Sequence, residues 1–157
     1  MKKIFLIVTI VATAFIQKSF SQGATTATSQ LLQSYLSIKN ALVAGNADKA
    51  SATAAEFVKN LNSIDAKIIN DADRSALLKD ASHITASKDI KHQREHFAGF
   101  SDNMIALAKA VKLSEEPIYI AYCSMKKSSW LSSEKAIKNP YYGNMMLTCG
   151  SVKETIK

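Results

Sequence analysis

The stretch SKDIKHQREHFAGFSDNMIALAKAV, residues 87–111, decides the fold class. Its large apolar residues recur at helical spacing, which predicts one long helix with a single buried face. These residues are Ile90, Phe97, Phe100, Met104, Leu107 and Val111. We therefore expect a helix over the whole stretch, with Met104 as a core residue and the charged positions facing solvent.

Three earlier stretches show the same helical period. They run from about Ser29 to Ala44, from about Ala47 to Leu61 and from about Asp71 to Ser87. The Gly45-Asn46 pair is typical of a helix end, and Asp71 or Asp73 is expected to cap the third of these helices. Because short loops make consecutive helices antiparallel neighbours, the expected fold is all-α, an up-and-down four-helix bundle.

The sequence pattern changes after Leu113. Pro117 ends the helical region, and the β-branched and aromatic run IYIAYC, residues 118–123, predicts a short strand. A helical turn is expected at residues 133–138. We expect residues 118–157 to form a small irregular C-terminal cap containing a short strand or hairpin, so that residues 29–157 make one domain.

The N-terminal residues are typical of a secretory signal peptide. Lys2 and Lys3 precede an apolar run of 13 residues, and small residues stand near Ser21. The run is shorter than the ~20 residues that a membrane-spanning helix needs. We expect residues 1–21 to be removed and residues 22–28 to form a disordered leader. The protein would then be periplasmic or secreted, with no membrane insertion after cleavage.

The charge and the motifs argue against several functional classes. The net charge is +7, and the predicted signal peptide carries three of the lysines, which leaves +4 spread along the rest of the chain. Scattered lysines are typical of a soluble surface and not of a nucleic-acid-binding face. The sequence also has no Gly-rich phosphate loop, nucleophile elbow or EF-hand pattern. We therefore expect a protein that is not an enzyme and binds no nucleic acid.

Residues 92–96, HQREH, match the H-x-x-E-H motif of one class of zinc proteases. In that motif two histidines hold zinc and the glutamate activates water, but a third ligand must come from another helix. The sequence supplies no obvious one. We interpret His92, Glu95 and His96 as surface residues, and His83 as a surface or helix-end residue. A hydrolase built on this motif is the least favoured of the three functional hypotheses, and the other two follow below.

Both cysteines and most methionines lie in the predicted cap. Met125, Met145 and Met146 fall between Cys123 and Cys149. Thiolate and thioether sulfurs are soft donors, which favour Cu(I) over harder ions. On an extended strand Cys123 and Met125 would share a face, and Met146 and Cys149 could converge on a turn.

A disulfide between Cys123 and Cys149 is the alternative. In an oxidising compartment a disulfide is the default for two cysteines. Closing this loop would stabilise the fold by about 3.5 kcal/mol, and the methionines would then pack around Trp130. Spacing alone leaves both alternatives open, and the two are compatible as redox states of one site.

Several short motifs closely resemble a bacterial domain family that has no assigned function. The motifs are YCSM at 122–125, WLS at 130–132, IKNPYYG at 137–143, MLTCG at 146–150, and upstream YLSIKNAL at 35–42 and QREHF at 93–97. That family occurs as small exported proteins and as an extra domain on periplasmic adaptor (membrane-fusion) subunits of copper/silver-type heavy-metal efflux pumps. Its pattern reads Cys-Pro-Met where this chain has Cys123-Ser124-Met125, so both sulfur residues are kept.

The resemblance implies copper or silver handling, with a periplasmic efflux adaptor as a partner. Carried over by position, the resemblance implies four sulfur ligands: Cys123, Met125, Met146 and Cys149. Met145 would be a neighbour of this set, and His96 is a candidate helper. The first hypothesis is an exported, non-enzymatic protein that binds Cu(I) or a similar soft metal ion. The second is a module without metal, in which a disulfide staples the cap and the cap docks on an efflux adaptor or another envelope protein.

Overall fold

The computed structural model describes residues 26–157, so the predicted signal peptide and residues 22–25 of the predicted leader lie outside the described residues. Helices come first: one at 26–43, then α2 (Ala47–Ser63), α3 (Asp71–Ala86) and α4 (Ile90–Ala110). The strands follow: β1 (Ile118–Cys123), β2 (Ser128–Ser132) and, after the 3₁₀ helix Gly143–Met145, β3 (Ser151–Ile156). No helix in this part of the chain has the length and apolar character that a membrane crossing requires.

The four predicted helices are confirmed, with small differences at their ends. Residues 26–28 are already helical, so they do not belong to a disordered leader. The N-cap of α3 is Asn70, whose side-chain oxygen accepts a hydrogen bond from the amide of Asp73 at 2.9 Å. Because Asn70 caps the helix, Asp71 and Asp73 lie in its first turn, where carboxylates interact favourably with the helix dipole.

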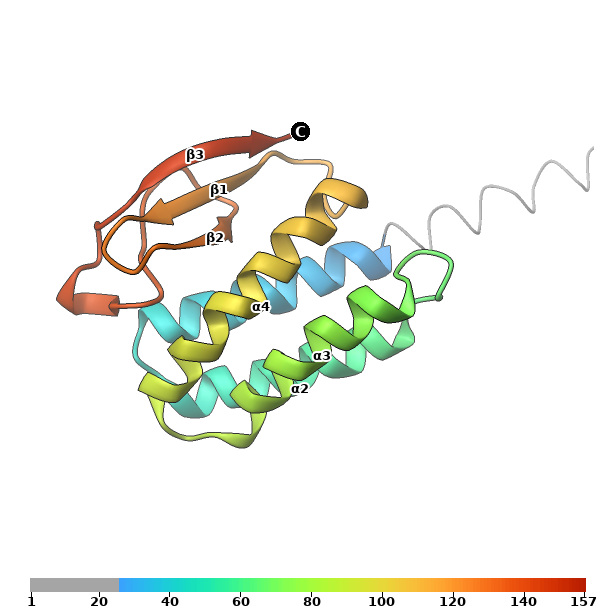
Figure 1. The fold of residues 1–157 in the computed structure, drawn as a ribbon, viewed down its shortest axis with the longest axis horizontal. Helices are drawn as coiled ribbons and strands as arrows, with labels where there is room; N and C mark the ends of the chain where they lie inside the picture. The colour runs from blue at the N-terminus through green and yellow to red at the C-terminus, as the bar shows by residue number, and fades with distance from the viewer. Residues whose placement is uncertain (1–25) are drawn as a thin grey trace, which may run out of the picture.

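The helices bury a cluster of aromatic rings between them. Helix α3 packs against α2 and α4, and the N-terminal helix lies beside α4 (Figure 1). The ring of Tyr35 lies 5.4 Å from that of Phe97 and 5.5 Å from that of Phe100, measured between centroids. Phe57 of α2 meets Phe100 edge-on at 4.7 Å. These rings and the predicted core residue Met104 are fully buried, so this cluster is the centre of the core.

The C-terminal cap contains a three-stranded antiparallel sheet with the strand order β2-β1-β3. It lies over α4 and the N-terminal helix, away from α2 and α3 (Figure 1). The predicted strand at 118–123 is confirmed as β1. The predicted helical turn at 133–138 is wrong, because these residues form bends and irregular structure. β3 was not predicted: its residues, SVKETI, are mostly exposed and so show no apolar alternation.

The hydroxyl of Tyr35 joins the sheet to two helices. It accepts a hydrogen bond from the backbone amide of Leu131 in β2 at 3.0 Å and lies 2.8 Å from the Ser101 hydroxyl of α4. Burial raises the pKa of Tyr35 far above its ordinary value, which keeps the hydroxyl protonated and able to donate to Ser101. This buried contact fixes the cap on the helices.

Gly143 lets a loop of the cap come close to the end of the N-terminal helix. Its φ of 55° lies in the left-handed region. A Cβ at this position would lie 2.5 Å from Nη2 of Arg94 and 2.8 Å from the carbonyl oxygen of Val43. Arg94 in turn donates to the carbonyl oxygen of Leu42 at 2.8 Å. The absence of a side chain at Gly143 therefore allows the loop that carries Met145 to pack closely against the helices.

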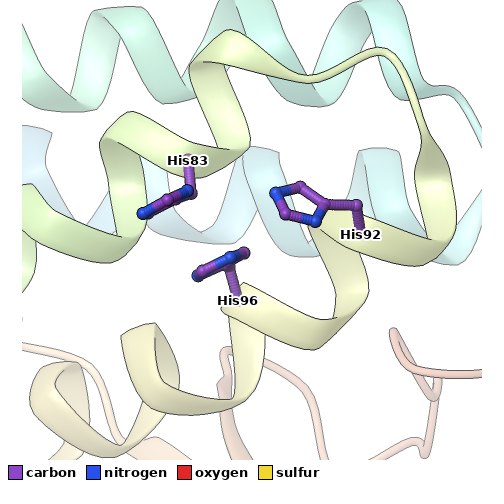
Figure 2. Close-up of side chains that lie close together, drawn as sticks. All are labelled: His83, His92 and His96. Atoms are coloured by element: carbon purple, nitrogen blue, oxygen red, sulfur yellow. The ribbon is translucent and has the colours of Figure 1, made fainter.

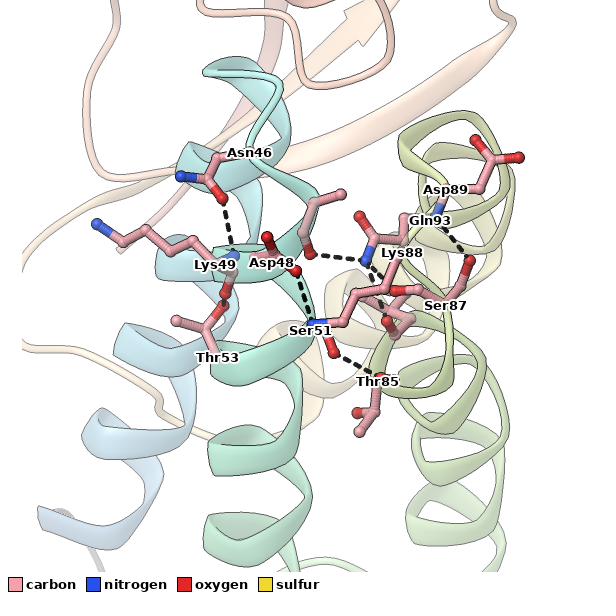
Figure 3. A network of polar contacts seen from close by, with 12 residues as sticks. Asn46, Asp48, Lys49, Ser51, Thr53, Thr85, Ser87, Lys88, Asp89 and Gln93 are labelled. Carbon is pink, nitrogen blue, oxygen red and sulfur yellow. Dashed lines mark hydrogen bonds and ion pairs between the residues drawn. The ribbon is translucent and has the colours of Figure 1, made fainter.

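A polar network joins the start of α2, the end of α3 and the start of α4 (Figure 3). At its centre is the fully buried side chain of Gln93. Its amide nitrogen donates to three backbone carbonyl oxygens, those of Ala47 at 3.0 Å, Ile84 at 3.2 Å and Ser87 at 2.7 Å. The network fixes the last turn of α3 relative to the first turns of α4.

Replacing Gln93 is expected to destabilise the fold. In Gln93→Ala the three carbonyl oxygens lose their donor while buried, so the free energy of unfolding should fall by about 2–3 kcal/mol in urea denaturation. Gln33→Ala is the matched control, since Gln33 is exposed on the N-terminal helix, and should change stability by less than about 0.5 kcal/mol. Equal stability of the two variants would show that the network does not support the α3–α4 connection.

Candidate metal centres

The two cysteines meet at the end of β1. Cys123 is fully buried and Cys149 is half-buried. Both thiols are free, and their sulfur atoms lie 3.3 Å apart. This separation is longer than the ~2.05 Å of a disulfide bond. It is shorter than the ~4.6 Å between two sulfurs on opposite sides of one metal ion, taking ~2.3 Å for each metal–sulfur bond. The pair is therefore placed either to bond or to share an ion.

Hydrogen bonds around Cys123 favour its thiolate form. Burial raises the pKa of Cys123, but hydrogen bonds outweigh it and leave the pKa below its ordinary value. The donors are the backbone amides of Lys126 and Met125 and the side chains of Cys149 and Asn139. The pKa of Cys149 is raised, mainly by its hydrogen bond to Cys123 and also by burial. Cys123 is thus the more acidic thiol of the pair, and the thiolate is the metal-binding form of cysteine.

Asn139 holds the returning segment of the cap beside β1. The residue is fully buried. Its side-chain nitrogen donates to the carbonyl oxygen of Cys149 at 2.8 Å, and its side-chain oxygen accepts from the amide of Tyr141 at 2.9 Å. Its backbone amide donates to the carbonyl oxygen of Leu147 at 2.8 Å. These bonds fix the position of Cys149 relative to Cys123.

Met125 lies in the turn after β1, with 63% of its surface exposed. Cys123 and Met125 do not share one face of an extended strand, contrary to the prediction, because β1 ends at Cys123. There the chain reverses into β2: the amide of Lys127, which has a φ of 57°, donates to the carbonyl oxygen of Cys123 at 2.8 Å. Met125 therefore stands in an exposed turn, two residues after Cys123.

Met145 ends the 3₁₀ helix of the cap, and Met146 follows it three residues before Cys149. The amide of Cys149 donates to the carbonyl oxygen of Met146 at 3.1 Å, which confirms the predicted turn between them. Met145 is 76% exposed and lines a groove of about 410 Å³ between α4 and the cap. The structure thus brings the two cysteines together, and in the sequence Met125 and Met146 stand two and three residues from the nearer cysteine.

Three imidazoles meet where α3 and α4 face each other (Figure 2). His83 comes from the last turn of α3, and His92 and His96 come from the first half of α4. One ligand nitrogen from each ring lies within 4.8 Å of the other two. The rings of His83 and His96 are stacked, with centroids 4.0 Å apart and planes 2° from parallel. His83 is exposed and the other two are half-buried, so an ion can reach the group from solvent.

The sequence interpretation missed this cluster. It found no third imidazole on another helix, whereas His83 on α3 supplies one. A signal was available: only residues 87–89 separate α3 from α4, and a short helical hairpin brings the end of one helix to the start of the next. His96 also hydrogen-bonds to Asp80 at 3.1 Å. The structure therefore places the candidate helper His96 with the other histidines, and the described residues show no grouping of it with the thiols.

Glu95 takes a different direction from the two histidines of its motif. Its side chain lines the groove between α4 and the cap. Among the described side chains it does not join the group whose ligand atoms lie within 4.8 Å of one another. The water-activating carboxylate of the hydrolase hypothesis therefore stands apart from the three imidazoles.

Comparison with known proteins identifies the helical part of the chain. A family model described as "Protein of unknown function (DUF3347)" matches residues 31–116, which include most of the N-terminal helix, all of α2, α3 and α4, and the three histidines. The cap with its two cysteines lies outside the matched residues. No curated protein and no solved structure matches the chain. Because the matched residues make up more than half of the chain, this protein belongs to the DUF3347 family of proteins of unknown function.

Proposed function

We propose that this chain is an exported, non-enzymatic binding protein for a soft metal ion of the Cu(I) or Ag(I) type. The ion is held in the C-terminal cap by Cys123 and Cys149, with Met125 and Met146 as further sulfur ligands and Met145 as a neighbour. The helices, which we take to form an up-and-down four-helix bundle, carry the cap. In this proposal the protein supports metal handling or efflux in the cell envelope.

The observation that carries the proposal is the pair of free thiols 3.3 Å apart. Two cysteines at that separation can ligate one ion with small side-chain movements. The lowered pKa of Cys123 supports the same function, because forming its thiolate costs less than deprotonating an ordinary thiol. Two thiolates with thioethers nearby make a donor set that selects soft ions.

The exposed methionines add to this support. Met125 and Met145 are both more than half exposed, so an ion can reach their thioethers from solvent. Thioethers stay available in an oxidising compartment, and a flexible unbranched side chain can turn toward an ion held by the neighbouring thiols. The link to the envelope and to an efflux adaptor rests on the signal-peptide pattern of residues 1–21 and on the family resemblance of the cap motifs.

A Cu(I) titration tests the proposal. Protein reduced under argon is expected to take one Cu(I) per chain from a chromophoric Cu(I) chelator. Protein whose thiols have been oxidised to a disulfide should bind at least ~100-fold more weakly, a difference of about 2.7 kcal/mol, because the thiolates are consumed. Equal uptake by the two forms, or no uptake by the reduced form, would refute the thiol site.

The second candidate is a module without metal, in which a Cys123–Cys149 disulfide staples the cap and the cap docks on an efflux adaptor or another envelope protein. The short sulfur separation favours it as well. Mass spectrometry of protein isolated from copper-supplemented cells distinguishes the two. Two free thiols with bound copper agree with the first proposal, whereas an intact bridge in all molecules selects the second.

A further inference from the structure

We propose that His83, His92 and His96 form a second metal site, which takes a borderline divalent ion such as Zn²⁺ or Cu²⁺. The site is independent of the thiols, because it lies between α3 and α4 and its residues contribute no sulfur. Imidazole nitrogens prefer Zn²⁺, Cu²⁺ and Ni²⁺ to the hard ions Mg²⁺ and Ca²⁺. The two sites would therefore select ions of different chemistry.

The three imidazoles need little movement to share an ion. Their ligand nitrogens already lie within 4.8 Å of one another. Tetrahedral coordination at ~2.1 Å per bond places such nitrogens ~3.4 Å apart, which side-chain rotation can supply. The stacked rings of His83 and His96 must turn from their parallel arrangement (Figure 2). Three protein ligands leave the fourth tetrahedral position open. Water can reach this position, because His83 is exposed to solvent.

Asp80 orients the ring of His96. Its carboxylate oxygen lies 3.1 Å from Nδ1 of His96, so Nδ1–H donates to Asp80 and Nε2 is left as the ligand atom. Carboxylates bonded in this way to metal-binding histidines fix the ring and make it a better ligand. Asp80 is 16% exposed at its side chain, so the contact is shielded from solvent. Asp80 is therefore a positioning residue of the proposed site.

Gly99 provides the space for this carboxylate. It lies on α4 three residues after His96, and a Cβ there would come within 2.8 Å of the Asp80 Oδ2 atom. Glycine in a helix interior costs roughly 0.5–1 kcal/mol relative to alanine. The carboxylate that orients His96 thus occupies room that a side chain at Gly99 would fill.

Hydrogen bonds from Gln93 connect the two helix turns that carry the histidines. Gln93 lies between His92 and His96 in the sequence and donates to the carbonyl oxygens of Ile84 and Ser87, which follow His83 by one and four residues. These bonds tie the helix turn that carries His83 to the turn that carries the other two histidines (Figures 2 and 3). The imidazoles are therefore brought together by a fixed helical hairpin before any ion binds.

Calorimetric titration with Zn²⁺ tests the site, using protein without an added histidine tag and with both cysteines changed to serine. One Zn²⁺ per chain is expected. His83→Ala should weaken binding at least ~100-fold, because two imidazoles remain, and it should fold normally since His83 is exposed. Mg²⁺ is the control ion and should give no heat of binding.

Asp80 supplies a second set of variants. Asp80→Ala is expected to weaken Zn²⁺ binding about 10–100-fold, and Asp80→Asn should recover most of the affinity because its amide oxygen still accepts from Nδ1 of His96. Asp71→Ala is the matched control: it removes the same charge from an exposed position in the first turn of α3, and its affinity should equal that of the parent protein.

The outcomes separate this site from the proposed function. Zn²⁺ binding in the protein that lacks cysteines, lost in His83→Ala, establishes the histidine site whatever the result with Cu(I). Unchanged Zn²⁺ affinity in both His83→Ala and His92→Ala would overturn the inference, as would the absence of Zn²⁺ binding by the parent protein at millimolar concentration.

Discussion

The double variant Cys123→Ser/Cys149→Ser is expected to lose Cu(I) affinity by at least ~1,000-fold, about 4 kcal/mol of binding free energy. Serine keeps the size of each side chain but replaces a soft thiolate by a neutral hydroxyl, which is a poor Cu(I) ligand. The remaining thioethers belong to a turn and a loop in which Met125 is 63% exposed and Met146 is half-buried, and they are expected to retain little of the affinity. Competition with a chromophoric Cu(I) chelator measures the loss.

Two further variants show whether the loss is specific to sulfur. Ser124→Ala is the control for the turn, because Ser124 is exposed beside Cys123, and it should bind Cu(I) like the parent protein. Met125→Ala/Met146→Ala should weaken binding about 10-fold or more, roughly 1.4 kcal/mol, if the thioethers complete the site. Retention of parent affinity by the double cysteine variant would place Cu(I) elsewhere in the molecule.

Trp130→Ala is expected to lower the free energy of unfolding by about 3–5 kcal/mol. The indole is almost fully buried in β2 and meets the ring of Tyr141 edge-on at 5.9 Å. It also lies beneath Gly150, since a Cβ there would be 2.9 Å from the indole ring. Removing the ring leaves a cavity under the segment that carries Cys149, so Cu(I) affinity should fall together with stability.

Urea denaturation of Trp130→Ala and of Trp130→Phe measures this effect. Phenylalanine fills part of the space and needs no hydrogen bond, so its cost should be about 1–2 kcal/mol. If Trp130→Ala lost less than about 1 kcal/mol, the cap would not depend on this side chain, and the account of how Cys149 is positioned would be wrong.

The helical part of the fold could be predicted because its signals are local. The apolar period of residues 90–111 and the Gly45-Asn46 stop follow from geometry that each helix satisfies alone. Gly45 has a φ of 71°, and Asn46 caps α2 by accepting from the amide of Lys49. The exact N-cap of α3 was missed, because Asn70, Asp71 and Asp73 are all residues that favour that position.

The rest depended on contacts between distant residues. β3 pairs with β1 through its backbone, and most of its side chains face solvent. Its sequence therefore lacks the alternation of apolar and polar residues that predicts a strand. The prediction of Met125 on a strand is wrong, because β1 ends at Cys123 and the amide of Lys127 closes a turn onto the carbonyl oxygen of Cys123. His83 can be recognised as a candidate metal ligand only when the α3–α4 hairpin places it beside His92 and His96.

Copper X-ray absorption on reduced protein carrying one equivalent of Cu(I) tests the central claim most directly. The account predicts sulfur scatterers at ~2.3 Å and none of the outer-shell features of imidazole rings, in the parent protein and equally in His83→Ala. A spectrum of nitrogen scatterers with imidazole features, unchanged in Cys123→Ser/Cys149→Ser, would contradict the assignment of Cu(I) to the thiols of the cap.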